Sequence, residues 1–241
     1  MTCSSDKLPA LSGVAKTLRA VMGGTYLAGV WDNGNLLHHH LAWSTTGPEL
    51  RPRPAYRAPT WSWASIDHPV KFWHKPGTDC LFHTKLVQAY VDPTGTDDTG
   101  AVKGGFLLLQ GHLKRISQPY NKEALSEAIK LHLDTCEEID YGDLFFLSLF
   151  TEYFMEETRY GDIDWDNFGR HLILVRHPQY RTGYRRVGFA TTAWHDTDDP
   201  NHQDEAEVDP GNVFLEEIEV DVACEGYRGP GEREGHLVKI Y

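Results

Sequence analysis

Apolar residues repeat along this chain with two different periods, and the change from one period to the other divides the sequence. Between Pro9 and Met22 they recur every three or four positions, and Gly23 and Gly24 follow. This spacing predicts an amphipathic helix that ends at a glycine. A second, shorter helix is predicted over 35–43. Four prolines between 48 and 59 then predict an extended connector.

From Trp61 onward the apolar runs are short, and glycine, proline and aspartate turns separate them, which is typical of β-strands. We predict strands near 61–65, 70–73, 80–91, 104–116, 129–134, 143–151, 170–177, 184–190, 213–222 and 235–240. The stretch 92–100 predicts a hairpin turn. Two acidic stretches, 156–166 and 195–209, are expected to form projecting loops.

The order of these elements predicts the fold class. Many short strands without long helices between them favour a mainly β fold, an antiparallel β-barrel or sandwich with an N-terminal helical segment. We expect a single β domain over 1–241. In it, 1–45 would form a helical appendage, 46–60 a proline-rich connector and 61–241 the antiparallel strands.

Composition narrows the classes of partner. The net charge is -12, from 35 acidic and 23 basic residues, so no nucleic acid partner is expected, because phosphate binding needs a concentrated basic face. No apolar run approaches the roughly 20 residues that span a bilayer, so no membrane partner is expected. The N-terminus lacks a signal-peptide pattern, and the four cysteines lie far apart without a CxxC pair. We therefore expect a cytoplasmic location.

The densest local signal is the stretch Tyr56–Ser65, in which Trp61 and Trp63 stand two residues apart behind a proline-rich approach. If the stretch is extended, alternation places both tryptophans on one face, because side chains of a strand repeat with period two. Such a face can be a wall of the core or a wall of a ligand site, and the sequence leaves both open.

Several segments together are similar to the region that follows the catalytic domain in fungal heterokaryon incompatibility proteins. The main matches are 6–13 with Ala15, 26–31 and 56–65, and weaker ones lie at 92–95, 104–111, 143–147 and 185–189. The family's incompatibility domain, which is related to Toll/interleukin-receptor-type folds and linked to cell death, should lie before Asp6, where five residues stand. None of its functional residues is therefore carried over.

The resemblance implies one of two origins for the chain. It is either a piece cut from a larger protein or a stand-alone descendant of the C-terminal region, and the initial methionine favours the second. A descendant without the death-linked domain needs another purpose. By analogy with fungal specialised metabolism, that purpose would be a small-molecule site, which is an argument from fold reuse and not from residues.

Common catalytic and cofactor motifs are absent: there is no P-loop, no dinucleotide fingerprint, no nucleophile elbow and no HExxH. We expect no cofactor and no metal. His38, His39 and His40 follow one another on a predicted helix, where consecutive residues point about 100° apart, so they cannot chelate one ion together. The acidic stretches 162–167 and 196–207 lack the glycine that a calcium loop requires.

The remaining chemistry is acid–base catalysis in an aromatic pocket. If 61–65 and 70–73 pair as a hairpin, Asp67 and His68 sit at its turn, and Asp67 and His74 are the candidate catalytic pair, since a histidine near a carboxylate can titrate near neutrality. Trp61, Trp63, Trp73 and Tyr153 are the candidate substrate-binding residues. A carboxylate group that includes Glu152 would rim the pocket. The plainer interpretation is that the turn residues are ordinary and the tryptophans fill the core.

Two functions follow from these alternatives. The first is a cofactor-independent catalyst of fungal specialised metabolism, of isomerase or cyclase type, that holds a hydrophobic small molecule against aromatic walls. The second is a non-catalytic regulatory or partner-binding module that derives from a heterokaryon incompatibility protein and binds a protein partner. The second predicts tryptophans packed in the core, no deep pocket and a flat apolar surface patch.

Overall fold

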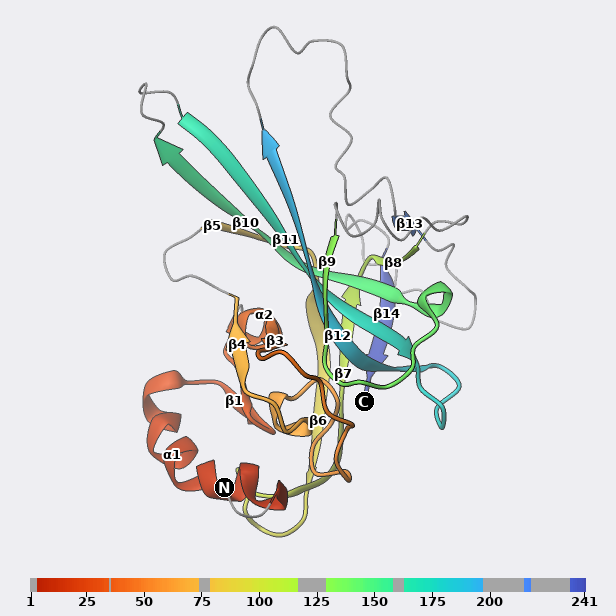
Figure 1. Ribbon diagram of the computed structural model, residues 1–241. Coiled ribbons are helices and arrows are strands. Elements are labelled where there is room, and N and C mark those ends of the chain that lie inside the picture. The colour runs from red at the N-terminus through yellow and green to blue at the C-terminus, as the bar shows by residue number, and fades with distance from the viewer. Residues whose placement is uncertain are drawn as a thin grey trace, which may run out of the picture.

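The computed structural model describes residues 4–34, 36–73, 79–116, 129–157, 163–196, 215–217 and 235–241 (Figure 1). The helices are the 3₁₀ turns η1 (Ser4–Asp6), η2 (Trp63–Ser65) and η3 (Tyr141–Asp143) and the α-helices α1 (Lys7–Met22) and α2 (Leu36–Leu41). The strands are β1 (Thr25–Leu27), β2 (Val30–Asp32), β3 (Trp43–Thr45), β4 (Val70–Phe72), β5 (Asp79–Phe82), β6 (Lys85–Pro93), β7 (Val102–Gly111), β8 (Leu113–Ile116), β9 (Ile129–Leu133), β10 (Phe145–Glu157), β11 (Ile163–Arg176), β12 (Gly183–Asp196), β13 (Leu215–Glu217) and β14 (His236–Ile240).

A large sheet dominates the fold. Its strands follow the order β13-β8-β10-β11-β12-β14-β7-β6, with β5 added to β10 and β9 added to β12. Every pair in it is antiparallel except β12 with β14, which is parallel. The long strands β10, β11 and β12 run the full length of the sheet, and at one end they extend beyond their neighbouring strands (Figure 1). The prediction of a mainly β, barrel-like fold with an N-terminal helix is confirmed.

The sheet closes nearly into a barrel because two strands turn a corner. β5 leads through His83 and Thr84 into β6, and β7 leads through His112 into β8. β6 and β7 pair with each other, whereas β5 and β8 both pair with β10. At the corner, a Cβ on Gly111 would stand 2.5 Å from the Cγ2 of Thr84. A glycine there lets the two bent strands approach closely.

The N-terminal segment packs against the barrel and shares its core. Leu8, Leu37 and Leu41 belong to the same buried cluster as Leu107 and Phe150 of the sheet. The predicted helices are confirmed, at Lys7–Met22 and Leu36–Leu41. The segment is not only helical, however: it also contains the hairpin β1–β2 and the strand β3.

A buried ion pair joins this segment to the sheet. The guanidinium of Arg186, on β12, pairs with Asp134 at 3.1 Å, and both side chains are 0% exposed. The same group donates to the backbone oxygens of Leu41, at 2.7 Å, and Trp43, at 2.5 Å, and lies 3.3 Å from the centre of the Trp43 ring. Arg186 thus holds β3 and the end of α2 on the sheet.

Some predicted elements are wrong. Residues 61–65 form no strand, because 63–65 adopt a 3₁₀ turn, and β4 pairs with β3, so the predicted hairpin of 61–65 with 70–73 does not exist. Part of each predicted acidic loop is strand, since β10 and β11 stay paired as far as Glu157 and Ile163, and β12 runs to Asp196. The rest of both stretches lies outside the described residues.

Other predictions hold. The strands near 80–91 and 104–116 exist, each divided in two by the barrel corner, and the predicted turn joins β6 to β7, with Thr94 N–H donating to Ala101. Residues 46–60 form neither helix nor strand, as the prolines indicate. None of the described helices is long and apolar enough to cross a membrane.

Candidate functional site

The double-tryptophan motif is built into the core. The Trp61 side chain is 0% exposed and belongs to the main buried cluster, and its backbone oxygen accepts from the Trp43 indole at 3.1 Å. Ser62 explains the local backbone: its hydroxyl accepts from the Ala64 N–H at 3.1 Å, which caps the 3₁₀ turn. With no exposed surface, the Trp61 side chain offers no wall to a ligand.

The segments 6–13, 26–31 and 56–65 meet at this motif. The Ser62 hydroxyl donates to Ala28 at 2.5 Å, and the Trp63 indole donates to Gly29 at 2.8 Å, so both residues bind the turn between β1 and β2. Gly29 has a φ of 99°, and a Cβ there would stand 3.0 Å from the Trp63 indole nitrogen. Lys7, at the start of α1, donates to the Ile66 oxygen and lies 5.8 Å from the centre of a Trp63 ring. The motif is thus a junction between elements.

The candidate acid–base residues are not brought together by this junction. Asp67 forms an ion pair with Arg57 at 2.6 Å, and the Arg57 guanidinium also donates to the oxygens of Ala64, at 2.6 Å, and Ile66, at 2.5 Å. This arrangement makes Asp67 part of the support of the 3₁₀ turn. His68 is buried and accepts from the Arg51 N–H at 2.6 Å. His74 lies outside the described residues.

Trp73 and Tyr153 lie elsewhere. The Trp73 indole donates to Ser44 at 3.0 Å, and its ring stacks on Phe189 with centroids 6.0 Å apart. Tyr153, on β10, is opposite Asn167 of β11 and follows Glu152 directly. Because successive strand residues face opposite ways, Tyr153 points away from the face that carries Glu152.

Glu152 does not rim a pocket. Its side chain is 0% exposed and accepts two hydrogen bonds from Arg170, at 2.8 and 2.5 Å. The Arg170 guanidinium lies 5.2 Å from the centre of the Trp73 ring. Burial lowers the pKa of Arg170, and Glu152 opposes that shift. Arg170 thus places a positive charge, which Glu152 neutralises, next to the Trp73 ring.

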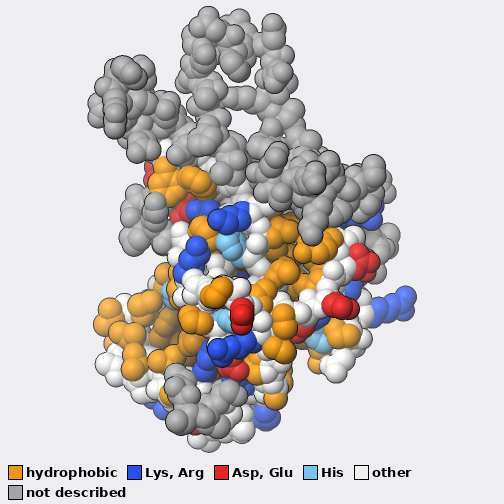
Figure 2. All heavy atoms as spheres, in the orientation of Figure 1, with side chains coloured by type: hydrophobic (Ala, Val, Ile, Leu, Met, Phe, Trp, Pro, Cys, Tyr) orange, Lys and Arg blue, Asp and Glu red, His pale blue; other side chains and the backbone are white. Residues whose placement is uncertain are grey.

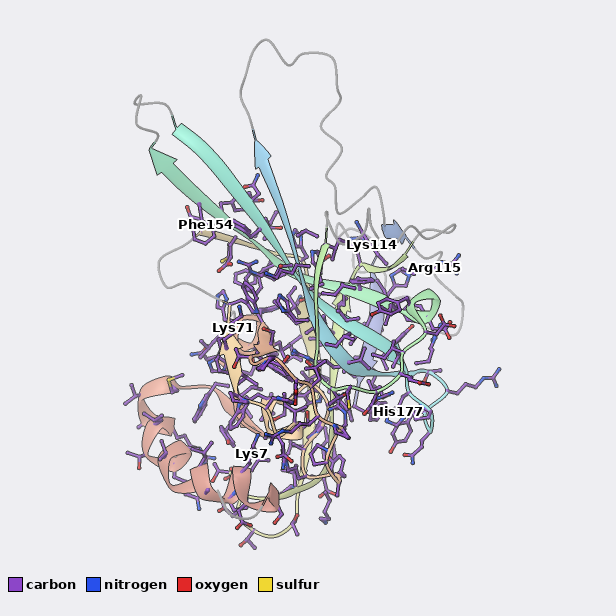
Figure 3. The ribbon with its side chains drawn as sticks, in the orientation of Figure 1. Lys7, Lys71, Lys114, Arg115, Phe154 and His177 are labelled. Carbon is purple, nitrogen blue, oxygen red and sulfur yellow. The ribbon has the colours of Figure 1, made fainter. Side chains whose placement is uncertain are left out.

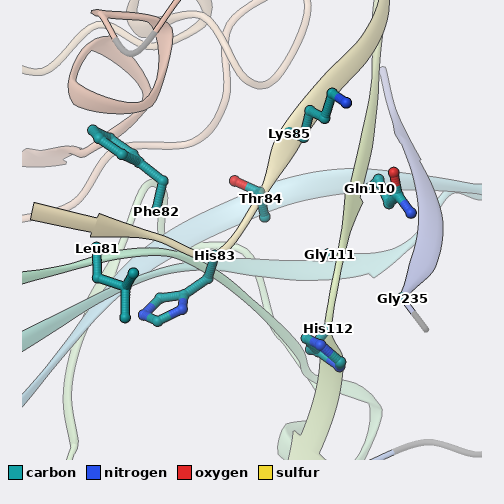
Figure 4. Close-up of a pocket in the computed structure, with 9 residues that line it drawn as sticks. All are labelled: Leu81, Phe82, His83, Thr84, Lys85, Gln110, Gly111, His112 and Gly235. Carbon is teal, nitrogen blue, oxygen red and sulfur yellow. The ribbon is translucent and has the colours of Figure 1, made fainter. Parts of the chain in front are cut away.

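A cleft opens at the barrel corner, where β5 and β8 run apart beyond the paired strands β6 and β7 (Figure 4). Its volume is about 350 Å³, and it is lined by 81–85, 110–112 and Gly235. His83 and His112 lie at one end of it and Lys85 toward the other (Figure 4). His83 Nε2 lies 2.8 Å from the Thr151 hydroxyl. Nothing in the sequence marks this cleft, because its residues become neighbours only when the strands bend.

Each histidine of the triplet 38–40 has its own neighbour. His38 is hydrogen-bonded to the Thr84 oxygen at 2.7 Å, the His39 ring lies 4.9 Å from that of Phe150, and His40 accepts from the Trp31 N–H at 2.9 Å. Burial lowers the pKa of His40. Throughout the described part of the chain, no three His, Cys, Asp or Glu side chains gather in a metal-binding arrangement.

Comparisons with known proteins add no relative: no protein-family model, no curated protein and no solved structure matches this chain. The interpretation of the site therefore depends on its own geometry.

Proposed function

We propose that the chain is a non-catalytic, partner-binding module of the kind that follows the incompatibility domain in fungal heterokaryon incompatibility proteins. We further propose that the outer face of α1 is its contact surface. The aromatic residues that suggested a substrate site support this choice, because Trp61 is buried and Trp63 binds the β1–β2 turn.

The observation that carries the proposal is an apolar stripe on α1. Val14, Leu18 and Val21 lie three and four residues apart, so they share one side of the helix, and they are 55%, 41% and 82% exposed. The opposite side of α1 is already used, since Leu8 and Ala15 are buried. Figure 2 shows hydrophobic side chains gathered over this helix. Contiguous exposed apolar surface of this kind marks interaction sites.

The resemblance indicates which partner fits. In the family, the incompatibility domain stands before the segment that matches 6–13, and here that segment is the beginning of α1. Along the chain, α1 and the short turn η1 before it are thus the described elements nearest to the expected position of such a domain. An apolar face on that domain, docked on the stripe, would bury Val14, Leu18 and Val21.

Isothermal titration calorimetry tests this proposal. The titrant is an isolated incompatibility domain from a fungal protein in which the Tyr56–Ser65 motif follows that domain. Leu18→Ser with Val21→Ser should weaken the association at least tenfold, because docking no longer buries two aliphatic side chains of roughly 1.5–3 kcal/mol each.

The matched control replaces the same two residue types on the sheet, Leu81→Ser with Val87→Ser, which are 52% and 50% exposed. This pair should leave the affinity unchanged. Equal losses in both variants, or no association of the unaltered chain, would contradict the proposal.

A small-molecule catalyst is the second candidate, and the cleft at the barrel corner supports it. A volume of about 350 Å³ lies within the range of ligand pockets, and His83 and His112 could move protons without a cofactor. Ligand-observed NMR with a library of small apolar compounds tests this candidate. Binders should be lost in His83→Ala with His112→Ala, and a library without any binder would remove the cleft as a site.

We place the module in the cytoplasm. Among the described residues, Cys136 is an exposed free thiol, which a reducing compartment preserves. Non-reducing electrophoresis of protein taken rapidly from its native cells tests this placement, since a disulfide-linked product would contradict it.

A further inference from the structure

A group of basic side chains surrounds Trp73, and we call Lys71, Lys130, His132 and Arg170 the Trp73 cluster. The Lys71 ammonium lies 3.7 Å from the centre of the Trp73 ring, and the Arg170 guanidinium lies 5.2 Å from it. The His132 ring is 5.1 Å from Trp73. Figure 3 labels Lys71 on β4, and Figure 2 shows Lys and Arg side chains gathered near a histidine on this face.

The strands explain how distant residues meet there. Lys71 comes from β4, and Lys130 and His132 come from β9, where they stand two residues apart and so share a face. The residues between and beside them, Ile129 and Leu131, pack into a separate apolar cluster on the other side. The face that carries Lys130 and His132 is therefore the one turned away from that cluster.

The charges of the Trp73 cluster do not balance. Glu152 compensates Arg170, but neither Lys71 nor Lys130 has an acidic partner within the described ranges of the chain. Elsewhere on the protein, Lys16 pairs with Asp97 at 2.9 Å and Lys103 with Asp92 at 3.5 Å. Two ammonium groups that no described carboxylate compensates thus stand together on a protein whose net charge is -12.

The crowding of like charges affects the neighbouring groups. Partial burial of the Lys71 ammonium, and then the nearby charges of Lys130 and Arg170, lower the pKa of Lys71. The pKa of His132 is lowered to about 4 by burial and then by Lys71 and Lys130. His132 Nε2 is also buried without a hydrogen-bond partner among the described residues. Such an unsatisfied polar group calls for an explanation. An anion among these residues would reduce the repulsion between the positive charges and could accept a hydrogen bond from His132 Nε2.

We propose that the Trp73 cluster binds a doubly charged oxyanion of the phosphate type, held by the Lys71 and Lys130 ammonium groups. A phosphate monoester carries between about 1.5 and 2 negative charges at neutral pH, which matches the two uncompensated lysines. Phe189 and Lys71 occupy the surroundings of the Trp73 ring, so the geometry favours recognition of the charge alone and not of a stacked base. The site shares no residue with α1. The phosphate proposal can therefore be tested independently of the proposed partner surface.

Thermal unfolding in inorganic phosphate tests the proposal, with sodium chloride of equal ionic strength as the reference. Phosphate should raise the Tm of the unaltered chain, and Lys71→Gln with Lys130→Gln should abolish that rise. Both lysines are exposed, so this variant is expected to fold. Lys16→Gln with Lys103→Gln makes the same change in net charge elsewhere and should keep the rise.

NMR titration of His132 supplies a readout at the site itself. Lys71 of β4, Lys130 of β9, and Arg170 of β11 with its partner Glu152 of β10 are the charged groups around it. Bound phosphate should raise the pKa of His132 by about one unit or more, because a nearby anion favours the protonated ring. An equal rise in Tm for both lysine variants, an unchanged His132 titration, or an equal effect of acetate would overturn the proposal.

Discussion

Acid should destabilise this protein through His171, a histidine buried in the middle of β11. Its two ring nitrogens are hydrogen-bonded to the hydroxyls of Ser148, at 3.0 Å, and Thr192, at 3.1 Å. Burial lowers the pKa of His171 from 6.5 to about 3, with smaller effects from His83, Lys114 and Arg170. The native protein therefore keeps this ring neutral at pH values where the unfolded chain protonates it.

The sign and size of the effect follow from that difference. Above pH 6.5 both states are neutral at His171, and its contribution to stability is constant. Below that value only the unfolded chain takes up the proton, so stability falls until the native ring titrates near pH 3. At about 1.4 kcal/mol per pH unit, the loss between pH 6.5 and 5 is about 2 kcal/mol.

Urea unfolding followed by tryptophan fluorescence at pH 7, 6 and 5 measures this loss. His171→Asn should cost stability at pH 7, because it removes packing and a hydrogen bond, but the gap to the unaltered protein should narrow by about 2 kcal/mol at pH 5. Thr192→Val is the matched control, since it removes a partner of the ring and keeps the titrating group. Its pH dependence should parallel that of the unaltered protein. A gap for His171→Asn that stays constant between pH 7 and 5 would refute the reasoning.

Two further predictions concern the scaffold. Arg186→Met should destabilise the fold by about 3–5 kcal/mol in urea unfolding, because it leaves Asp134 charged and buried, whereas Arg185→Met, which breaks a partly exposed pair with Glu137, should cost under about 1 kcal/mol. Equal costs would show that burial of the Arg186 pair is unimportant. Gly111→Ala should cost about 1–3 kcal/mol through overlap with Thr84. Gly104→Ala, with no atom within 4 Å of the new Cβ, should change little, and a similar cost at both glycines would contradict the close approach at the corner.

The sequence predicts the sheet well, because strands in this protein follow local rules. The strand near 129–134 illustrates this: Ile129, Leu131 and Leu133 alternate with polar residues and pack on one side in the structure. The N-terminal helix is equally local, since its apolar period and the terminal Gly23, with a φ of 64°, suffice to define it. How the barrel closes is not local, because it depends on β5 and β8 meeting the same strand β10.

The double-tryptophan segment shows where the pattern misleads. Alternation of Trp61, Ser62 and Trp63 has the period of a strand, but the Ser62 side chain binds its own backbone at Ala64 and the distant oxygen of Ala28. Serine competes with regular structure in this way wherever a local bond is available. The hydrogen bonds of Ser62, three residues after Pro59, outweigh the period-two pattern that predicts a strand.

The Trp73 cluster could not be predicted for a different reason. Lys71, Lys130 and Arg170 lie in three separate segments, and each looks like an ordinary surface charge beside the 35 acidic residues of the chain. Only the pairing of β9 with β12 and of β3 with β4 brings them to one ring. The excess of acidic residues argues against binding long nucleic acids but does not prevent a local excess of positive charge.

The Tyr56–Ser65 motif holds the fold together, whereas the exposed residues of α1 and of the Trp73 cluster are free to contact other molecules. This difference predicts which residues would change if proteins of this architecture had different functions. Ser62, Trp63 and Arg57 bind backbone oxygens, so their side chains fix the β1–β2 turn and the 3₁₀ turn η2 and cannot vary without loss of the junction. Lys71, Lys130 and the stripe on α1 make no such bonds among the described residues, and their replacement costs little stability. A ligand or a partner can therefore change while the motif stays the same. The buried segments that hold the fold together are for this reason the wrong place to look for its function, and the exposed residues that they hold in position are the better one.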